Sequence, residues 1–294
     1  MVSQKVEETG GSAGGGFWRP LPRAAIPGLL TLPLLAYLIV FYGLPVLSML
    51  SRSIDDNGWT LSVFVKVIKD PAFWRVMQIT ATISLVTTLC CLLIAYPLAF
   101  FMARLQKSTA NLVMILVLVP FWTSILVRTY AWMVILGRRG IINDFLVWIG
   151  ITAQPFQLLN TRFAVYVAMV HVLLPFMVLP LYASIRALDW RLVQAANGLG
   201  AGAFGAFRQV VLPLSMPGVA AGCILVFTLA IGFYITPALV GGPSDMMMSM
   251  LIENEVRRFD WGAAAAMATV LLAIVLLLFG IFARFVPFNP VVRR

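Results

Sequence analysis

The sequence predicts an all-α polytopic membrane protein with six transmembrane helices. Of its 294 residues, 61% are hydrophobic and only 11% are charged, whereas ordinary soluble domains carry about 25% charged residues. Six long apolar stretches each approach the roughly 20 residues that a helix needs to cross a bilayer. Helices are the expected form for these stretches, because every backbone polar group in lipid must be satisfied within the protein.

The first half of the chain contains three predicted spans, at about 24–50, 76–102 and 110–136. Residues 1–23 form a polar tail whose run GGSAGGG at 10–16 is typical of disorder. The first span is too long for the apolar region of a signal peptide, so no signal peptide is expected. Kinks are predicted at the prolines in or near these spans, which are Pro33, Pro45, Pro97 and Pro120.

The second half contains spans at about 163–185, 217–241 and 262–286, followed by a short tail at 287–294. Pro175, Pro180 and Pro237 predict further kinks. Gly218 and Gly222 form a GxxxG pair, which permits close helix packing within the chain or against a partner. The six spans together define one transmembrane domain at 24–286.

The net charge of +10 does not indicate nucleic-acid binding. The basic residues flank apolar runs and form no basic stripe on a folded domain, so attraction to lipid headgroups explains them better. With both termini in the cytoplasm, eleven of the 21 basic residues lie inside and nine outside, with Arg128 in a span. This weak bias favours cytoplasmic termini.

No constellation for catalysis or metal binding is present in the sequence. One histidine cannot form a multi-histidine metal site, and Cys90, Cys91 and Cys223 lie in apolar segments as expected for buried thiols. No lysine follows a glycine, so the chain has no P-loop. We therefore expect no catalytic residue, metal or cofactor on this chain, and any ATP and Mg²⁺ must bind to another subunit.

The segment 189–213 is the longest clearly non-membrane stretch of the second half, and it predicts two short helices around a glycine hinge. Asp189 is a suitable N-cap for the first helix. The second helix is expected to end at Pro213, since proline disfavours the helical conformation of the preceding residue. The hinge is predicted at glycines that allow positive φ, namely Gly198, Gly200 and Gly202.

This segment resembles the EAA loop in membrane-spanning subunits of type I ABC importers. Its pattern is filled in order by Gln194-Ala195-Ala196, Gly200, Val210 and Leu212-Pro213. The resemblance implies the permease fold of that family and a cytoplasmic coupling helix that docks on an ATPase subunit. Gln194 replaces the usual glutamate, so an amide hydrogen bond would take the place of a salt bridge. The implied coupling residues are Asp189, Gln194, Ala195, Ala196, Gly200, Leu212 and Pro213.

Two more blocks, 119–143 and 212–243, resemble the polyamine and related branch of these permeases. The first brings aromatic residues together with Arg128, and the second ends in an aromatic-Thr-Pro-Ala-Leu-x-Gly-Gly run. Pro237 is expected to open the helix and free carbonyls toward a cavity. The implied pathway residues are Trp122, Arg128, Tyr130, Trp132, Phe233, Tyr234, Thr236, Asp245 and Glu253.

Several of these residues have two interpretations. Arg128 either lines the pathway or pairs with a carboxylate or a helix end. Asp245, Glu253 and Glu255 either draw cations inward or pair with Arg257 and Arg258. His171 is expected to be a neutral, hydrogen-bonded packing residue. The methionine-rich run at 246–250 is either packing or a contact for a binding protein.

The resemblance implies a subunit of an ATP-driven importer in the bacterial inner membrane. Its partners would be a second permease subunit, two ATPase subunits, a periplasmic solute-binding protein and membrane lipid. The implied solute is a polyamine such as putrescine or spermidine. An opine or other amino-acid-derived solute is the alternative, favoured by Arg128 and by Gly232, where many family members carry an acid. An ATP-independent secondary transporter is the alternative from another class.

Overall fold

The computed structural model of the protein describes residues 25–52 and 61–285. The predicted tails at 1–23 and 287–294 lie outside the described residues. All regular structure in the described part is helical, so the predicted all-α class is confirmed. The chain divides into two units, Met1–Met49 and Leu50–Arg294, and each is described by itself.

The described part of the first unit is one apolar helical stretch. It consists of α1 (Ala25–Leu38), a π-helical turn (Ile39–Gly43) and the start of α2 (Leu44–Arg52). Thr31–Met49 is long and apolar enough to cross a membrane. The π-helical turn lies directly before Pro45, which has no N–H for the carbonyl four residues earlier. In the widened turn before this proline, the Leu44 N–H bonds to the Ile39 carbonyl, five residues earlier.

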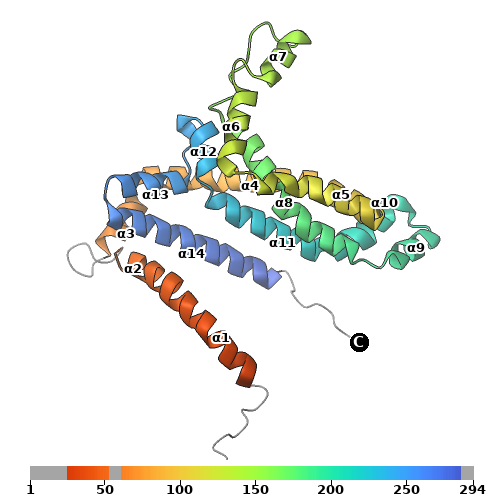
Figure 1. The fold of residues 1–294 in the computed structure, drawn as a ribbon, viewed down its shortest axis with the longest axis horizontal. Coiled ribbons are helices and arrows are strands. Elements are labelled where there is room, and N and C mark those ends of the chain that lie inside the picture. The colour runs from red at the N-terminus through yellow and green to blue at the C-terminus, as the bar shows by residue number, and fades with distance from the viewer. Residues whose placement is uncertain (1–24, 53–60, 286–294) are drawn as a thin grey trace, which may run out of the picture. The chain divides into compact units, whose positions relative to one another are not determined.

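Three long helices, α4, α8 and α11, form the centre of the second unit (Figure 1). These helices are α4 (Pro71–Arg104), α8 (Arg162–Arg186) and α11 (Leu212–Ile231). A Cβ on Gly218 would lie 2.4 Å from the Ser184 Cβ, and a Cβ on Gly222 would lie 2.7 Å from the Met177 sulfur. The GxxxG pair thus allows α11 to pack closely on α8 within this chain.

A smaller core lies where α14 (Trp261–Phe285) packs against α3 (Ser62–Lys69) and α13 (Met248–Arg257). The hydrophobic side chains of this core include Val67, Phe73, Met248 and Ala266, all buried. The backbone N–H of Met248 donates to the Thr80 hydroxyl at 2.8 Å, which fixes the start of α13 on α4. The short helices α3 and α13 had no counterpart among the predicted elements, because they are amphipathic and too short for a hydropathy signal.

The third predicted span is broken. Helix α5 (Lys107–Leu118) continues into a short 3₁₀ turn (Val119–Trp122), and the chain then bends before α6 (Ile125–Leu136) and α7 (Ile141–Trp148). The bend between Lys107–Trp122 and Ile125–Trp148 is 95°. Counting this bent pair as one span, the described residues contain six segments able to cross a membrane. The bend lies just beyond the kink predicted at Pro120.

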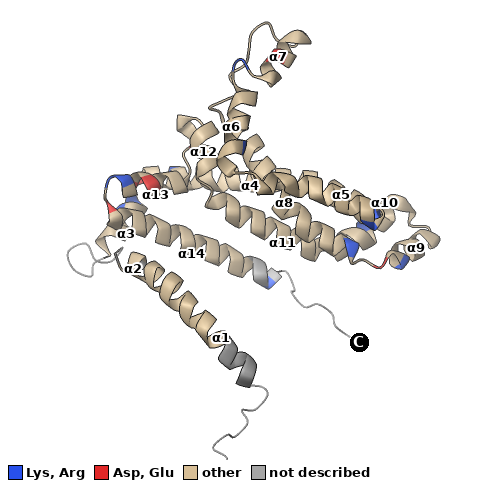
Figure 2. Ribbon diagram, viewed as in Figure 1, with Lys and Arg blue, Asp and Glu red and all other residues tan. Residues whose placement is uncertain are grey.

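The fifth predicted span is also interrupted. Helix α11 ends at Ile231, and α12 (Ile235–Val240) begins after a short break. A 3₁₀ turn (Pro243–Asp245) then leads to α13. Figure 2 shows the charged residues gathered toward the two ends of the α4–α8–α11 bundle, with few along the helices between them. This distribution is the one expected for helices whose middle parts lie in lipid.

Candidate functional site

The segment after α8 forms the predicted helix and hinge. Helix α9 (Trp190–Gly198) begins where the Asp189 carboxylate accepts a hydrogen bond from the Arg191 N–H at 3.0 Å. The chain then reverses at Gly200 and Gly202, whose φ angles are +86° and +64°. Gly198 ends α9 without a positive φ. The glycine hinge is therefore present, at two of the three predicted positions.

The prediction that Pro213 ends the second helix is wrong. Helix α10 (Gly202–Ala206), a π-helical turn (Phe207–Val211) and α11 form one helical segment from Gly202 to Ile231. Pro213 lies inside this continuous segment, where it has no N–H to donate to the Gln209 carbonyl. The turn before it widens, and the Leu212 N–H bonds to the Phe207 carbonyl. Leu212 and Pro213 thus connect the hinge rigidly to a long helix.

Helix α9 and the hinge present apolar side chains to the outside of this chain. Leu199 is 89% exposed, and Leu192 and Phe204 are also exposed. Gln194 and Ala195 are exposed beside them, whereas Ala196 is half-buried. Exposed apolar side chains grouped on one surface are typical of an interaction site. We call the exposed residues of this segment the coupling surface, after the role that the sequence resemblance implies; they are Leu192, Gln194, Ala195, Leu199 and Phe204.

A cluster of four aromatic rings joins the coupling surface to α4. The Trp190 ring lies 6.2 Å from that of Phe100, and the Phe207 ring lies 5.9 Å from Tyr96 and 5.8 Å from Phe100. The Arg104 guanidinium lies 4.3 Å from the centre of the Phe100 ring. These rings come from α4, α9 and the turn before α11, so they hold the three elements in contact.

Polar contacts reinforce the same junction. The Tyr96 hydroxyl and the Ser215 hydroxyl are 2.9 Å apart, which links α4 to α11. The Arg186 guanidinium at the end of α8 donates to the carbonyls of Ala103 and Leu105, both at 3.1 Å. These carbonyls belong to the last turn of α4, where a cation is favoured by the helix dipole. All three central helices are therefore fixed to one another next to α9.

The predicted pathway residues of the third span are divided between exposed and packed positions. Trp122 is 83% exposed, and Tyr130 is exposed as well. Trp132 is half-buried, and its indole N–H donates to His171 Nδ1 at 3.1 Å. This geometry requires an unprotonated Nδ1, so it agrees with the predicted neutral packing histidine.

Arg128 has no ion pair in the part of the chain that the structure describes. Its side chain is half-buried, and its Nε is buried without a hydrogen-bond partner among the described residues. Asp144 is the one acidic residue in the described spans, and no ion pair joins it to Arg128. The structural pairing considered for Arg128 is therefore not made within the described chain.

The predicted pathway residues of the fifth span lie around the break between α11 and α12. Phe233 and Tyr234 are half-buried in the break, whereas Thr236 is buried with its hydroxyl 3.2 Å from that of Thr129. The carbonyl four residues before Pro237 is that of Phe233, which lies in the break before α12. It accepts from the Ser249 hydroxyl at 2.7 Å. The expectation that freed carbonyls face a cavity is therefore wrong for Phe233.

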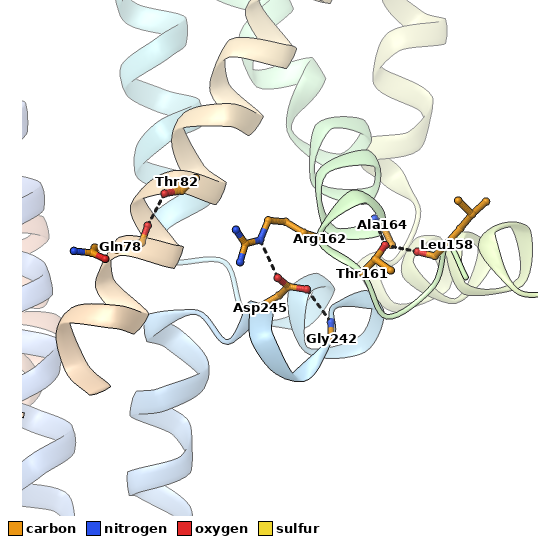
Figure 3. Close-up of polar contacts among 8 residues, drawn as sticks. All are labelled: Gln78, Thr82, Leu158, Thr161, Arg162, Ala164, Gly242 and Asp245. Atoms are coloured by element: carbon orange, nitrogen blue, oxygen red, sulfur yellow. Dashed lines mark hydrogen bonds and ion pairs between the residues drawn. The ribbon is translucent and has the colours of Figure 1, made fainter. Parts of the chain in front are cut away.

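Asp245 makes a contact that the sequence did not predict. Its carboxylate is 2% exposed and accepts from Arg162 Nε at 2.9 Å and from the Gly242 N–H at 3.2 Å. Figure 3 shows the Arg162 guanidinium between Asp245 and the part of α4 that carries Gln78 and Thr82. Arg162 and Asp245 are 83 positions apart, and no sequence pattern connects residues at that separation.

The other two acidic residues near this end, Glu253 and Glu255, form the predicted pairs with Arg257 and Arg258. Glu253 pairs with Arg257, and Glu255 lies 3.4 Å from Arg258. Hydrogen bonds to the Glu253 carboxylate and then to the Tyr234 hydroxyl raise the pKa of Arg257. In the methionine-rich run, Met247 and Met248 are fully buried, which supports the packing interpretation for these two residues. No group of three potential metal ligands occurs among the described residues.

Comparison with known proteins gives consistent matches over most of the chain. Residues 95–288 match the family described as "Binding-protein-dependent transport system inner membrane component". The spermidine/putrescine transport system permease protein PotB of Escherichia coli is 35% identical over 257 residues, 84% of this chain and 94% of PotB. The PotB of Haemophilus influenzae is 38% identical over 255 residues, 83% of this chain and 89% of that protein.

A solved structure supports the same fold. It is the crystal structure of a bacterial alginate ABC transporter in complex with an alginate pentasaccharide-bound periplasmic protein. One of its chains matches with a TM-score of 0.71 and 20% identity, over 89% of this chain and 95% of that chain. At this identity the match concerns the fold alone.

Proposed function

This chain belongs to the family of binding-protein-dependent transport system inner membrane components, and from this premise we propose how it works. We propose that it pairs with a second permease subunit to form a solute path across the bacterial inner membrane. Two ATPase subunits would bind the coupling surface, and a periplasmic solute-binding protein would deliver the solute. ATP and Mg²⁺ would bind only to the ATPase subunits. The chain would perform no covalent chemistry.

The connection between α9 and the long helices carries the coupling part of this proposal. An ATPase subunit that closes on ATP would push on the coupling surface. The rings of Trp190, Phe100 and Phe207 would pass this displacement to α4 and α11. Rigid-body movement of packed helices is a common way to turn a small shift into a new access state. In this arrangement α9 and both termini lie on the cytoplasmic side.

A polyamine such as putrescine or spermidine is the proposed solute. The names of the PotB relatives, at 35% and 38% identity, support this class. The exposed rings of Trp122 and Tyr130 could contact an organic cation, and each such contact contributes about 0.5–2 kcal/mol. Phe233, Tyr234, Thr236 and Glu253 remain candidate pathway residues of the proposal, and Asp245 would act there only through its pair with Arg162.

An amino-acid-derived solute with a carboxylate, such as an opine, is the second candidate. One specific observation favours it: Arg128 makes no ion pair among the described residues, and its Nε has no hydrogen-bond partner there. Gly232 at the break would accept a side chain, since a Cβ there meets nothing within 4 Å. Direct binding of putrescine and of an opine to the associated binding protein distinguishes the two solutes.

The test of coupling is reconstitution of the whole transporter in lipid vesicles. We expect the loaded binding protein to stimulate ATP hydrolysis, and Ala195→Trp or Gly200→Trp to abolish both stimulation and uptake. Gly280→Trp is the matched control, because Gly280 on α14 also has nothing within 4 Å of a built Cβ. Uptake that persists in the Ala195→Trp variant, or solute flux in vesicles without any ATPase subunit, would overturn the proposal.

A further inference from the structure

Helices α6 and α7 form a lateral arm, which we define as residues 125–148. Figure 1 shows this arm standing out from the bundle of α4, α8 and α11. The arm follows the 95° bend after Trp122. Near its base it packs on α12 and α8 through Thr129 and Trp132. Beyond its base the arm contacts the loop at 149–161 through Asn143 and Phe156, and many of its side chains are exposed.

The bend lies at membrane depth. Helix α5 has 12 residues and the following 3₁₀ turn has 4, so together they extend about 26 Å. The hydrocarbon core of a bilayer is about 30 Å thick. The segment starts at the exposed residue Lys107, next to the exposed Arg104, and these cations are suited to the headgroup region. The chain therefore bends before it has left the hydrocarbon layer.

The bend also exposes irregular backbone. Trp122, Thr123 and Ser124 are all exposed, and the Ser124 side chain does not cap α6. The first N–H groups of a helix have no partner within it. Irregular backbone at this depth is tolerated only where protein covers it or a water-filled cavity reaches it, because lipid offers no hydrogen-bond acceptors. Lipid alone is therefore a poor cover for this bend.

The side chains of the arm point to a protein as the cover. Val127, Tyr130 and Val134 are exposed along α6, and Ile141 and Trp148 along α7, Trp148 at 80%. Asn143 makes the arm rigid, since its side chain bonds to the Gly137 carbonyl and to both the N–H and the carbonyl of Phe156. The arm also exposes the charged residues Arg138, Arg139 and Asp144. A rigid arm that carries large exposed apolar side chains is suited to binding, because little conformational entropy is lost when it is covered.

We propose that the lateral arm packs against the second permease subunit. This inference rests on the proposed function and names the surface on which the two permeases meet. The other partners fit less well. The binding protein approaches from water and does not reach the hydrocarbon layer, and the ATPase subunits would bind the coupling surface at the α9 end of the bundle.

Site-specific photocrosslinking in the assembled transporter tests this contact. The photoreactive amino acid p-benzoylphenylalanine is placed at Val127 or Trp148 on the arm, and at Leu199 on the coupling surface as the matched exposed control. The tagged complex is irradiated in membranes, and the adducts are identified by mass spectrometry. We expect Val127 to give an adduct with the second permease, and Leu199 to give one with an ATPase subunit.

The two positions separate failure of the inference from failure of the proposed function. Adducts of Val127 and Trp148 with lipid or the binding protein only, together with an ATPase adduct at Leu199, would overturn the arm contact alone. An adduct with a second copy of this chain would show a homodimer and would overturn the assignment of a different subunit. If no ATPase subunit co-purifies and Leu199 gives no ATPase adduct, the proposed function itself fails.

Discussion

The Nε atom of Arg162 lies 2.9 Å from a carboxylate oxygen of Asp245, and this contact joins the start of α8 to the turn after α12. The other carboxylate oxygen accepts from the Gly242 N–H at 3.2 Å. Next to this pair, the Asn160 N–H donates to the Val240 carbonyl at 3.0 Å. A single buried carboxylate thus organises both connections at the end of the bundle opposite α9.

Loss of the Arg162 guanidinium is therefore expected to destabilise this end of the protein. Arg162→Gln leaves the buried Asp245 carboxylate without its cation. Because the Arg162 side chain is itself partly exposed, we expect this loss to cost about 1–3 kcal/mol. Asp245→Asn should cost less, because the amide keeps the shape and Arg162 can be hydrated. Thermal unfolding of the purified complex measures both. Arg75→Gln, at an exposed arginine of α4, is the control, and equal stability of the two arginine variants would contradict the prediction.

The Phe207 ring is expected to be needed for coupling but not for assembly. It contacts Tyr96 and Phe100, and each aromatic contact contributes about 0.5–1.5 kcal/mol. In Phe207→Ala the ATPase subunits should still co-purify, while uptake and stimulated ATP hydrolysis fall by roughly tenfold, as expected for a loss of about 1.4 kcal/mol. Phe163→Ala, at an exposed phenylalanine of α8, should change neither. Normal uptake by Phe207→Ala would exclude the ring cluster from transmission.

Two glycines in long helices are expected to respond oppositely to alanine. A Cβ on Gly218 would lie 2.4 Å from the Ser184 Cβ and 2.8 Å from the Pro180 carbonyl oxygen, so α11 must move away from α8. Overpacking of this kind destabilises by about 1–3 kcal/mol. Gly280 meets nothing within 4 Å, and Gly280→Ala should be neutral or stabilising by up to about 1 kcal/mol. Unfolding temperatures of the two purified variants provide the comparison.

The sequence was sufficient to predict features that depend on local chemistry. Apolar length predicted the spans, the Asp189 carboxylate predicted the start of α9, and the glycines predicted the hinge. The sequence failed where one local rule has two structural outcomes. Proline at 213 can end a helix, or it can be accommodated inside a helix by a widened turn just before it. The structure shows the second outcome. The predicted kink at Pro120 became a break a few residues later.

Side-chain direction was the part of the candidate site that the sequence could not supply. Trp132 and Thr236 were both expected along the pathway, but their polar atoms contact His171 and Thr129 within this chain. The partner of Asp245 was missed because Arg162 is close only in the folded protein. Hydropathy gives the position of a helix along the chain, but the residue types do not say which neighbouring helix a polar atom will meet.

The hydrogen bond from the Ser249 hydroxyl to the Phe233 carbonyl gives a last prediction. This carbonyl lies in the break before α12, outside the helix, so Ser249→Ala leaves it without its partner and should lower the free energy of unfolding by about 1 kcal/mol. Ser244→Ala, at an exposed serine of the same connection, should have no effect.

A double-mutant cycle with Pro237→Ala examines the cause, because it separates the coupling of two residues from their individual effects. Alanine at 237 restores an N–H and removes the ring that opposes a helical bond to the Phe233 carbonyl. We expect α12 then to extend back to this carbonyl, so the loss from Ser249→Ala should be smaller in the Pro237→Ala background. Unfolding in detergent of the four purified variants measures the cycle. If the two losses simply add, Ser249 is not compensating for the proline, and the break between α11 and α12 must be held by other contacts.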